Sequence, residues 1–268
     1  MNVNYNRYVS LMRKISDING SMAVLSWDQE VYMPAKGAEI RAQQVATLSG
    51  IAHELFVGNE VGDLLELLRK DDSLDVHQKK NISETLYDYT RRKKYSTEFV
   101  MKLSECTSQA FQAWSKAKDT SDFSLFAPHL KKVVQLKREE CELLGYESHP
   151  YNALLDLYER GAKVADLDIL FNDVKSQLLP FIKQIAEQPT IDSAFLFKHY
   201  DKDKQWAFGI DCLKQMNYDF EAGRQDISSH PFTISFNPND VRVTTRVNEN
   251  DFREMIWSCI HEGGHALY

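Results

Sequence analysis

The chain has 268 residues, of which 43% are hydrophobic and 26% are charged. Its formal net charge is −7, and this mildly acidic balance does not favour binding to nucleic acid or to an anionic membrane. The sequence shows neither a secretory signal nor an apolar run approaching the ~20 residues of a membrane span. We therefore expect a soluble, cytoplasmic protein whose length allows one large or two modest domains.

Most of residues 1–225 show apolar side chains that recur every three or four positions, which is the pattern of helices. Tyr8, Met12, Ile15 and Ile18 form one such stripe. With only 11 Gly and 7 Pro to interrupt the pattern, and no fixed repeat period, we do not expect a solenoid. The sequence predicts a mostly α, multi-helix fold in a single helical region over residues 1–268.

One segment departs from the helical pattern, at about residues 231–247. Apolar and polar side chains alternate there in two short runs, which are separated by the sequence Asn-Pro-Asn-Asp at 237–240. Alternation with period two on both sides of a turn sequence is typical of a β-hairpin. We expect a hairpin or small sheet at this place in the chain.

The last predicted helix covers residues 251–268. Asp251 and Glu254 resemble the start of a capping box. At 100° per residue, one side of this helix is apolar and should pack on the core. That side comprises Phe252, Met255, Ile256, Cys259, Ile260, Ala266 and Leu267. Ser258 and two histidines project from the other side.

His261 and His265 are four residues apart, so they lie one turn above the other and can reach one metal ion at ~2.0–2.1 Å. With Glu262 between them they form an H-E-x-x-H motif. On the order of 0.02 such matches are expected by chance from the His and Glu content of the chain. The two glycines at 263 and 264 indicate close approach by a neighbouring group, or a local accident of sequence.

These residue types predict metal-assisted peptide hydrolysis. Zinc held by His261 and His265 would lower the pKa of a bound water from 15.7 to about 7 and polarise the scissile carbonyl. Glu262 would accept the proton of that water as general base and pass it to the leaving amine. The alternative from the residues alone is a pair of hydrogen-bonded helix histidines.

The sequence also resembles the carboxypeptidase Taq family of metallocarboxypeptidases. The resemblance rests on LSWDQEVYMPAKGAEIR (25–41), GYESHPYNALLDLYERG (145–161), HPF (230–232), DVRVT (240–244) and HEGGHALY (261–268). Arg160 stands where the family pattern has proline, outside the proposed chemistry. The resemblance implies a neurolysin-like helical fold with a small sheet beside the zinc helix. It also implies a homodimer, peptide substrates shortened from their C-termini, and zinc or cobalt as the metal.

The resemblance assigns roles to residues of this chain. His261 and His265 would be metal ligands, and Glu262 the general base. His230, Asp240, Arg242 and Thr244 would line or brace the cleft beside them. From the residues alone, Asp240 is equally well explained as a turn residue, and Arg242 as a residue on the solvent-exposed face of a strand.

Family members are about twice as long as this chain, and their third zinc ligand is a glutamate that follows the H-E-x-x-H motif. A catalytic zinc site has three protein ligands and a water, so the resemblance places the third ligand beyond Tyr268 and indicates the N-terminal half of an enzyme. Two other functions stay open: an oligopeptidase or endopeptidase of the same fold, and a non-catalytic helical fragment.

Overall fold

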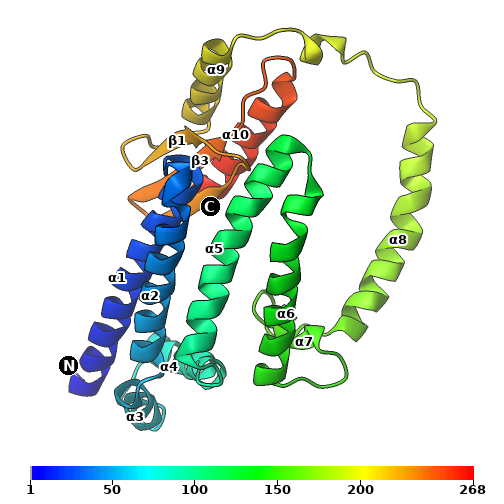
Figure 1. Cartoon of the computed structure of the whole chain (residues 1–268). Helices are drawn as coiled ribbons and strands as arrows, with labels where there is room; N and C mark the ends of the chain where they lie inside the picture. Colours follow the sequence, from blue (N-terminus) through cyan, green and yellow to red (C-terminus); the bar gives the residue numbers. More distant parts are fainter. Residues whose placement is uncertain (1) are drawn as a thin grey trace. The chain divides into compact units, whose positions relative to one another are not determined.

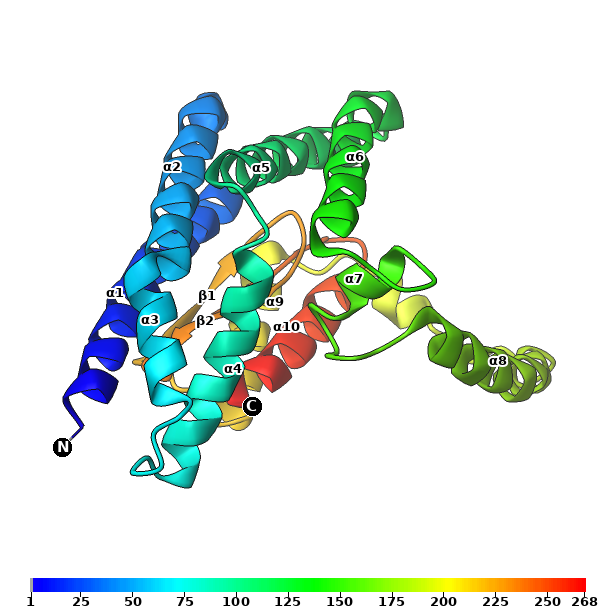
Figure 2. The same ribbon diagram turned by 90° about the horizontal axis from the view of Figure 1, so that it is seen from below.

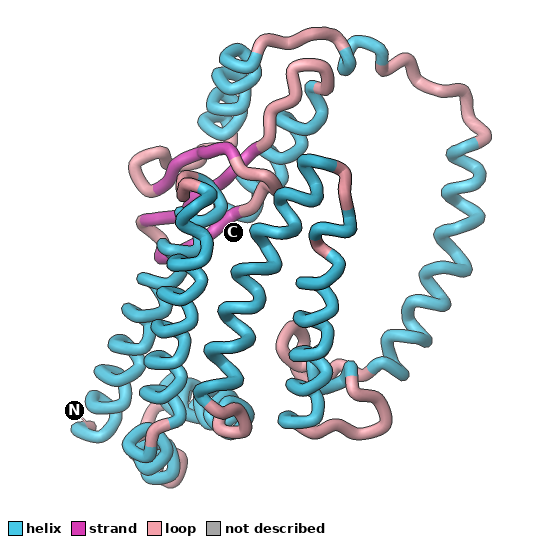
Figure 3. The backbone as a smooth tube through the Cα atoms, in the orientation of Figure 1, coloured by secondary structure: helices cyan, strands magenta, loops and turns pink. Residues whose placement is uncertain are grey.

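The computed structural model describes residues 2–268. The expected mostly helical fold with a small sheet is confirmed (Figure 3). The backbone forms two compact units: residues up to 22 together with 38–189, and residues 23–37 together with 190–268. In the described part of the chain, no helix is both long and apolar enough to cross a membrane.

The first unit is built from helices (Figures 1 and 2). Helix α1 also contributes its last residues to the second unit. The bounds are α1 Val3–Val31, α2 Ala38–Val57, α3 Asn59–Leu68, α4 Val76–Arg92, α5 Thr97–Thr120, α6 Ala127–Leu144, α7 Tyr151–Leu155 and α8 Val164–Ala186, with a 3₁₀ turn at Phe123–Leu125.

The core of this unit lies among the first four helices. The apolar side chains buried in this core are Tyr8, Ile15, Phe56, Val61, Leu65, Leu68, Leu74, Ile82 and Tyr89. The start of α4 is fixed by a capping box, in which Asp75 accepts from the backbone of Gln78 and the Gln78 side chain accepts from the backbone of Asp75. Such a cap stabilises a helix by roughly 1 kcal/mol.

Arg160, the departure from the family pattern, lies against α4. Its guanidinium carbon is 3.7 Å from the ring centroid of Tyr87. The same guanidinium forms an ion pair with Glu84 and lies 3.6 Å from the carboxylate of Asp88. Arg160 therefore ties the loop after α7 to α4, a role that proline could not fill.

The second unit holds the sheet. Beside the end of α1 it contains 3₁₀ turns at Ala35–Gly37 and Ala194–Phe197, helix α9 (Lys202–Gln215), strands β1 (Gly223–Ile227), β2 (Thr233–Asn237) and β3 (Asp240–Thr245), and helix α10 (Phe252–Leu267). The strand order is β1-β3-β2, with β1 parallel and β2 antiparallel to β3. Helix α10 packs against β3, β2 and α9.

Strands β2 and β3 form the expected hairpin, in which Asn237 pairs with Asp240. Strand β1 was not expected, because it begins at Gly223 within a range that the sequence predicted to be helical. Its sequence, Gly-Arg-Gln-Asp-Ile, has too little apolar alternation to signal a strand. The segment forms a strand because it pairs with β3, which lies more than a dozen residues further along the chain.

A small core under the sheet holds β3 in place. Leu213 on α9 is fully buried and packs with Tyr218 and Val243. The Tyr218 hydroxyl donates to the carbonyl of Val241 at 2.5 Å. Burial raises the pKa of Tyr218 to about 12, so this donor stays protonated at physiological pH.

Candidate metal centre

Helix α10 carries the H-E-x-x-H motif, and its first residues set its position. Asp251 is the N-cap, and its side chain accepts from the backbone N–H of Arg253 at 3.1 Å. The capping box expected between Asp251 and Glu254 does not form. Asp251 instead pairs with the guanidinium of Arg253, while Glu254 lies 3.6 Å from Arg246.

The two histidines of the motif converge. The Nε2 atoms of His261 and His265 lie 3.2 Å apart, and the two rings are nearly perpendicular, with centroids 4.7 Å apart. Two nitrogens bound tetrahedrally to one zinc ion at ~2.0–2.1 Å would be separated by ~3.3 Å. The observed separation is within hydrogen-bond distance for two ring nitrogens, and it also matches the separation of two nitrogens bound to a single zinc ion.

The pair is also accessible, because both histidines are exposed on α10. Among residues 2–268, no group of three or more His, Cys, Asp or Glu side chains is placed to hold a metal ion. A catalytic zinc site uses three protein ligands and a water. The described residues thus include two side chains that could serve as ligands of such a site, His261 and His265.

Glu262 is buried beside β2, with 7% of its surface exposed. The Thr233 hydroxyl lies 2.7 Å from Glu262 Oε2 and 2.8 Å from the Glu262 backbone carbonyl. A hydroxyl has one proton to donate, so it serves one of these oxygens at a time. Thr233 therefore orients the carboxylate that the motif predicts as general base.

The face through which α10 packs differs from the predicted stripe. Its buried residues are Met255, Ser258, Cys259, Glu262 and Gly263. Ile260 and Leu267, which the apolar pattern placed inside, are 44% and 50% exposed. The apolar pattern did not predict this buried face because it includes the polar residue Ser258. The Ser258 hydroxyl forms a hydrogen bond with the Thr245 hydroxyl, 2.6 Å away, which allows its burial.

The two glycines of the motif have different surroundings. A Cβ at Gly263 would lie 2.6 Å from Leu213 Cδ2 and 3.1 Å from Met216 Cε. A Cβ at Gly264 would meet nothing within 4 Å. The close approach expected from the sequence thus exists at Gly263 alone, and the approaching groups are side chains at the end of α9.

Thr244 connects the HPF segment to β3. It is buried, and its Oγ1 accepts from the backbone N–H of Phe232 at 2.8 Å. The Ser228 hydroxyl lies 2.7 Å from the same oxygen and 2.6 Å from the carbonyl of His230. His230 is itself exposed in the turn before β2. Thr244 therefore fixes the residues immediately before Thr233, which in turn contacts Glu262.

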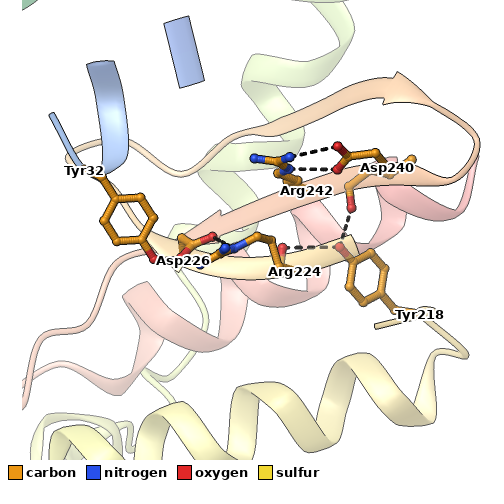
Figure 4. Close-up of polar contacts among 7 residues, drawn as sticks. Tyr32, Tyr218, Arg224, Asp226, Asp240 and Arg242 are labelled. Atoms are coloured by element: carbon orange, nitrogen blue, oxygen red, sulfur yellow. Dashed lines mark hydrogen bonds and ion pairs between the residues drawn. The ribbon is translucent and has the colours of Figure 1, made fainter. Parts of the chain in front are cut away.

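Asp240 and Arg242 bind each other on β3 (Figure 4). Both hydrogen bonds of this bidentate pair measure 2.8 Å. The Arg242 guanidinium also lies over the ring of Trp27, 4.4 Å from its centroid, and Trp27 is buried. With its donors turned to Asp240, Arg242 braces the sheet and is not a solvated side chain.

A second pair that the sequence did not reveal lies on β1. Arg224, the register partner of Arg242, binds Asp226 through bonds of 2.6 and 2.8 Å (Figure 4). The Tyr32 hydroxyl donates to Asp226, and this hydrogen bond raises the pKa of Tyr32. Tyr32 falls within the first family-like segment, but β1 had to be recognised as a strand before Arg224 and Asp226 could be placed beside it.

Known protein sequences match most of this chain. The sequence pattern of the carboxypeptidase Taq (M32) metallopeptidases matches residues 7–268. Carboxypeptidase 1 of Bacillus subtilis (strain 168) is 36% identical over 263 residues, which are 97% of this chain and 52% of that protein.

Solved structures give the same result. The crystal structure of BsuCP has a TM-score of 0.96 at 34% identity and covers 100% of this chain and 54% of its own. The structure of CHT has a TM-score of 0.85 at 55% identity, again over 100% of this chain and 54% of its own. The chain thus spans about half the length of the relatives it matches.

Proposed function

The chain belongs to the carboxypeptidase Taq (M32) family of metallopeptidases, and from this premise we propose that it supplies two metal ligands and the general base of a metal-dependent carboxypeptidase. The substrates would be peptides, shortened one residue at a time from the C-terminus. The 3.2 Å convergence of the His261 and His265 Nε2 atoms carries the proposal, because it fits one tetrahedral metal ion.

We propose zinc as the metal, with cobalt as the alternative, because two imidazoles on one helix suit both ions. When bound, the metal would polarise the peptide carbonyl and acidify a water molecule. Glu262 would accept the proton of the attacking water and deliver it to the leaving amine. Thr233 would hold the Glu262 carboxylate in the orientation that this transfer requires.

His230, Asp240, Arg242 and Thr244 would act as supports and not as reacting groups. Thr244 binds the HPF segment, and Asp240 binds Arg242. Through β2 these contacts fix the position of Thr233 and therefore of Glu262. Homodimer formation and a cytoplasmic location stay predictions, which light scattering and cell fractionation can check.

The direct test uses a completed chimera, in which residues 1–268 are followed by the part of B. subtilis carboxypeptidase 1 that has no counterpart in this chain. We expect it to release C-terminal residues from peptides, and to lose this activity with a chelator. Glu262→Gln should lower the rate by roughly 10²–10⁴-fold, the usual contribution of a general base. Glu159→Gln, at an exposed carboxylate, is the control.

A second candidate function is an endopeptidase built on the same helix. Peptides with free and amidated C-termini separate the two, because a carboxypeptidase needs the free carboxylate. Equal cleavage of both peptides by the chimera would favour the endopeptidase. Full activity of the Glu262→Gln variant would refute both.

A third candidate is a non-catalytic helical fragment, and it is motivated by the lack of a group of three candidate metal ligands among the described residues. It applies to the isolated chain and not to the completed chimera. We expect residues 1–268 alone to release no C-terminal residues at a rate that depends on Glu262.

A further inference from the structure

Helix α8 carries an apolar stripe that nothing in the first unit covers. None of the residues of α8 is buried, and both views show the helix standing apart from α5 and α6 (Figures 1 and 2). The α8 stripe consists of seven apolar side chains that are each 45–61% exposed: Leu170, Phe171, Val174, Leu178, Phe181, Ile182 and Ile185.

The stripe is a single face of the helix. Leu170, Val174, Leu178 and Ile182 follow one another at intervals of four, and so stack along one side of α8. Asn172 and Ser176 lie on the opposite side. Such an amphipathic helix is stabilised by packing its apolar face against a partner, and a soluble protein rarely leaves a contiguous patch of this kind uncovered.

The length of the relatives indicates what covers it. BsuCP matches the whole of this chain with a TM-score of 0.96, α8 included, yet this match takes up only 54% of its own chain. The backbone of α8 thus follows that of a helix which belongs to a protein nearly twice as long. A protein of that length has further polypeptide available to cover this face.

We propose that the α8 stripe is a docking surface for the part of the M32 polypeptide that this chain does not match, and that the two associate even as separate chains. The partner is a polypeptide with an apolar face complementary to the stripe. The association depends on apolar burial and not on the metal, so it holds whether or not the proposed peptide hydrolysis is correct.

The probe is the part of B. subtilis carboxypeptidase 1 that lies outside the 263 matched residues, produced as a separate polypeptide with residues 1–268. Size-exclusion chromatography with light scattering should show a 1:1 complex. Hydrogen exchange of the α8 backbone amides should slow on the order of 10-fold or more in the complex. Both measurements are made without zinc, so neither depends on catalysis.

The double variant Val174→Glu, Leu178→Glu places two charges in the stripe and should abolish the complex. The matched control Asn172→Glu, Ser176→Glu adds the same charge to the opposite face and should bind as the unaltered chain does. All four positions are exposed, so both variants should keep the helical circular dichroism of the unaltered chain.

Three results would overturn the proposal: no complex, a complex that forms equally well with the stripe variant, or unchanged exchange of the α8 amides within a complex. A homodimer of this chain that the stripe variant dissociates, and that the probe does not displace, would assign the face to a second copy instead.

Discussion

The hydroxyl of Thr233 on β2 lies 2.7 Å from Oε2 of Glu262 on α10. This contact joins the edge strand of the small sheet to the carboxylate of the H-E-x-x-H motif. It accounts for the burial of an acidic side chain between two exposed histidines, since a buried carboxylate needs a hydrogen-bond donor.

Thr233→Val removes that donor while keeping the shape of the side chain. In the completed chimera we expect kcat to fall roughly 10- to 100-fold, the equivalent of the ~1.5–3 kcal/mol of a hydrogen bond to a charged group. KM should change little, because Thr233 orients Glu262 and does not bind substrate. Thr233→Ser should restore most of the activity, whereas equal losses in the Val and Ser variants would argue against an orienting role.

The two adjacent glycines of the motif, Gly263 and Gly264, allow the same substitution to be compared in a crowded and in an open position. Gly263→Ala places a methyl group 2.6 Å from Leu213 Cδ2 and should destabilise the chain by about 1–3 kcal/mol through overpacking. Gly264→Ala meets no neighbour and should stabilise α10 by roughly 0.5–1 kcal/mol through helix propensity. Urea denaturation of the two variants measures both effects, and a loss of stability at Gly264 as large as that at Gly263 would contradict this geometry.

Thr244→Val deprives the backbone N–H of Phe232 of its acceptor. We expect the free energy of unfolding to fall by about 1–3 kcal/mol, the cost of leaving a partly buried donor unpaired. Thr107→Val, at an exposed position on α5, is the control and should stay within about 0.5 kcal/mol. Similar values for the two variants would show that Thr244 does not hold the HPF segment.

His53 makes the stability of the first unit sensitive to pH. Burial lowers the pKa of His53, although its Nε2 donates to the carbonyl of Tyr95 at 3.0 Å; nearby Arg92 also lowers the pKa and Glu54 raises it. The unfolded chain therefore binds this proton more readily than the folded chain does. Stability should fall as the pH drops below the ordinary histidine pKa of about 6.5.

Denaturation midpoints between pH 7.5 and 5.5 measure this effect. The decrease should be smaller in His53→Gln than in the unaltered chain, while His77→Gln, at an exposed position, should leave it unchanged. An identical decrease in His53→Gln would assign the pH dependence to other groups.

The sequence was sufficient to predict the helical fold, the hairpin and the motif, because each of them is a local pattern. Helical spacing revealed the core residues Tyr8 and Ile15, and the four-residue spacing of His261 and His265 placed both on one side of α10. Contacts between distant segments were not predictable in this way. β1 is a strand because it pairs with β3, and its own residues do not show it.

The orientation of α10 was the main error. Its apolar pattern placed Ile260 and Leu267 inside, yet the structure buries Ser258 and Glu262 instead. Hydrogen bonds with Thr245 and Thr233 make this face favourable, and no spacing rule within the helix could reveal hydroxyl groups on other strands. For the same reason the role of Thr233 could be recognised only from the structure.

The central claim, that His261 and His265 hold one metal ion together, is tested most directly by calorimetric titration of residues 1–268 with zinc. We expect one zinc ion per chain, with an affinity that falls more than about 10-fold in both His261→Ala and His265→Ala. His77→Ala should bind as the unaltered chain does. Equal affinity in all four proteins, or a loss in only one of the two motif variants, would contradict the claim.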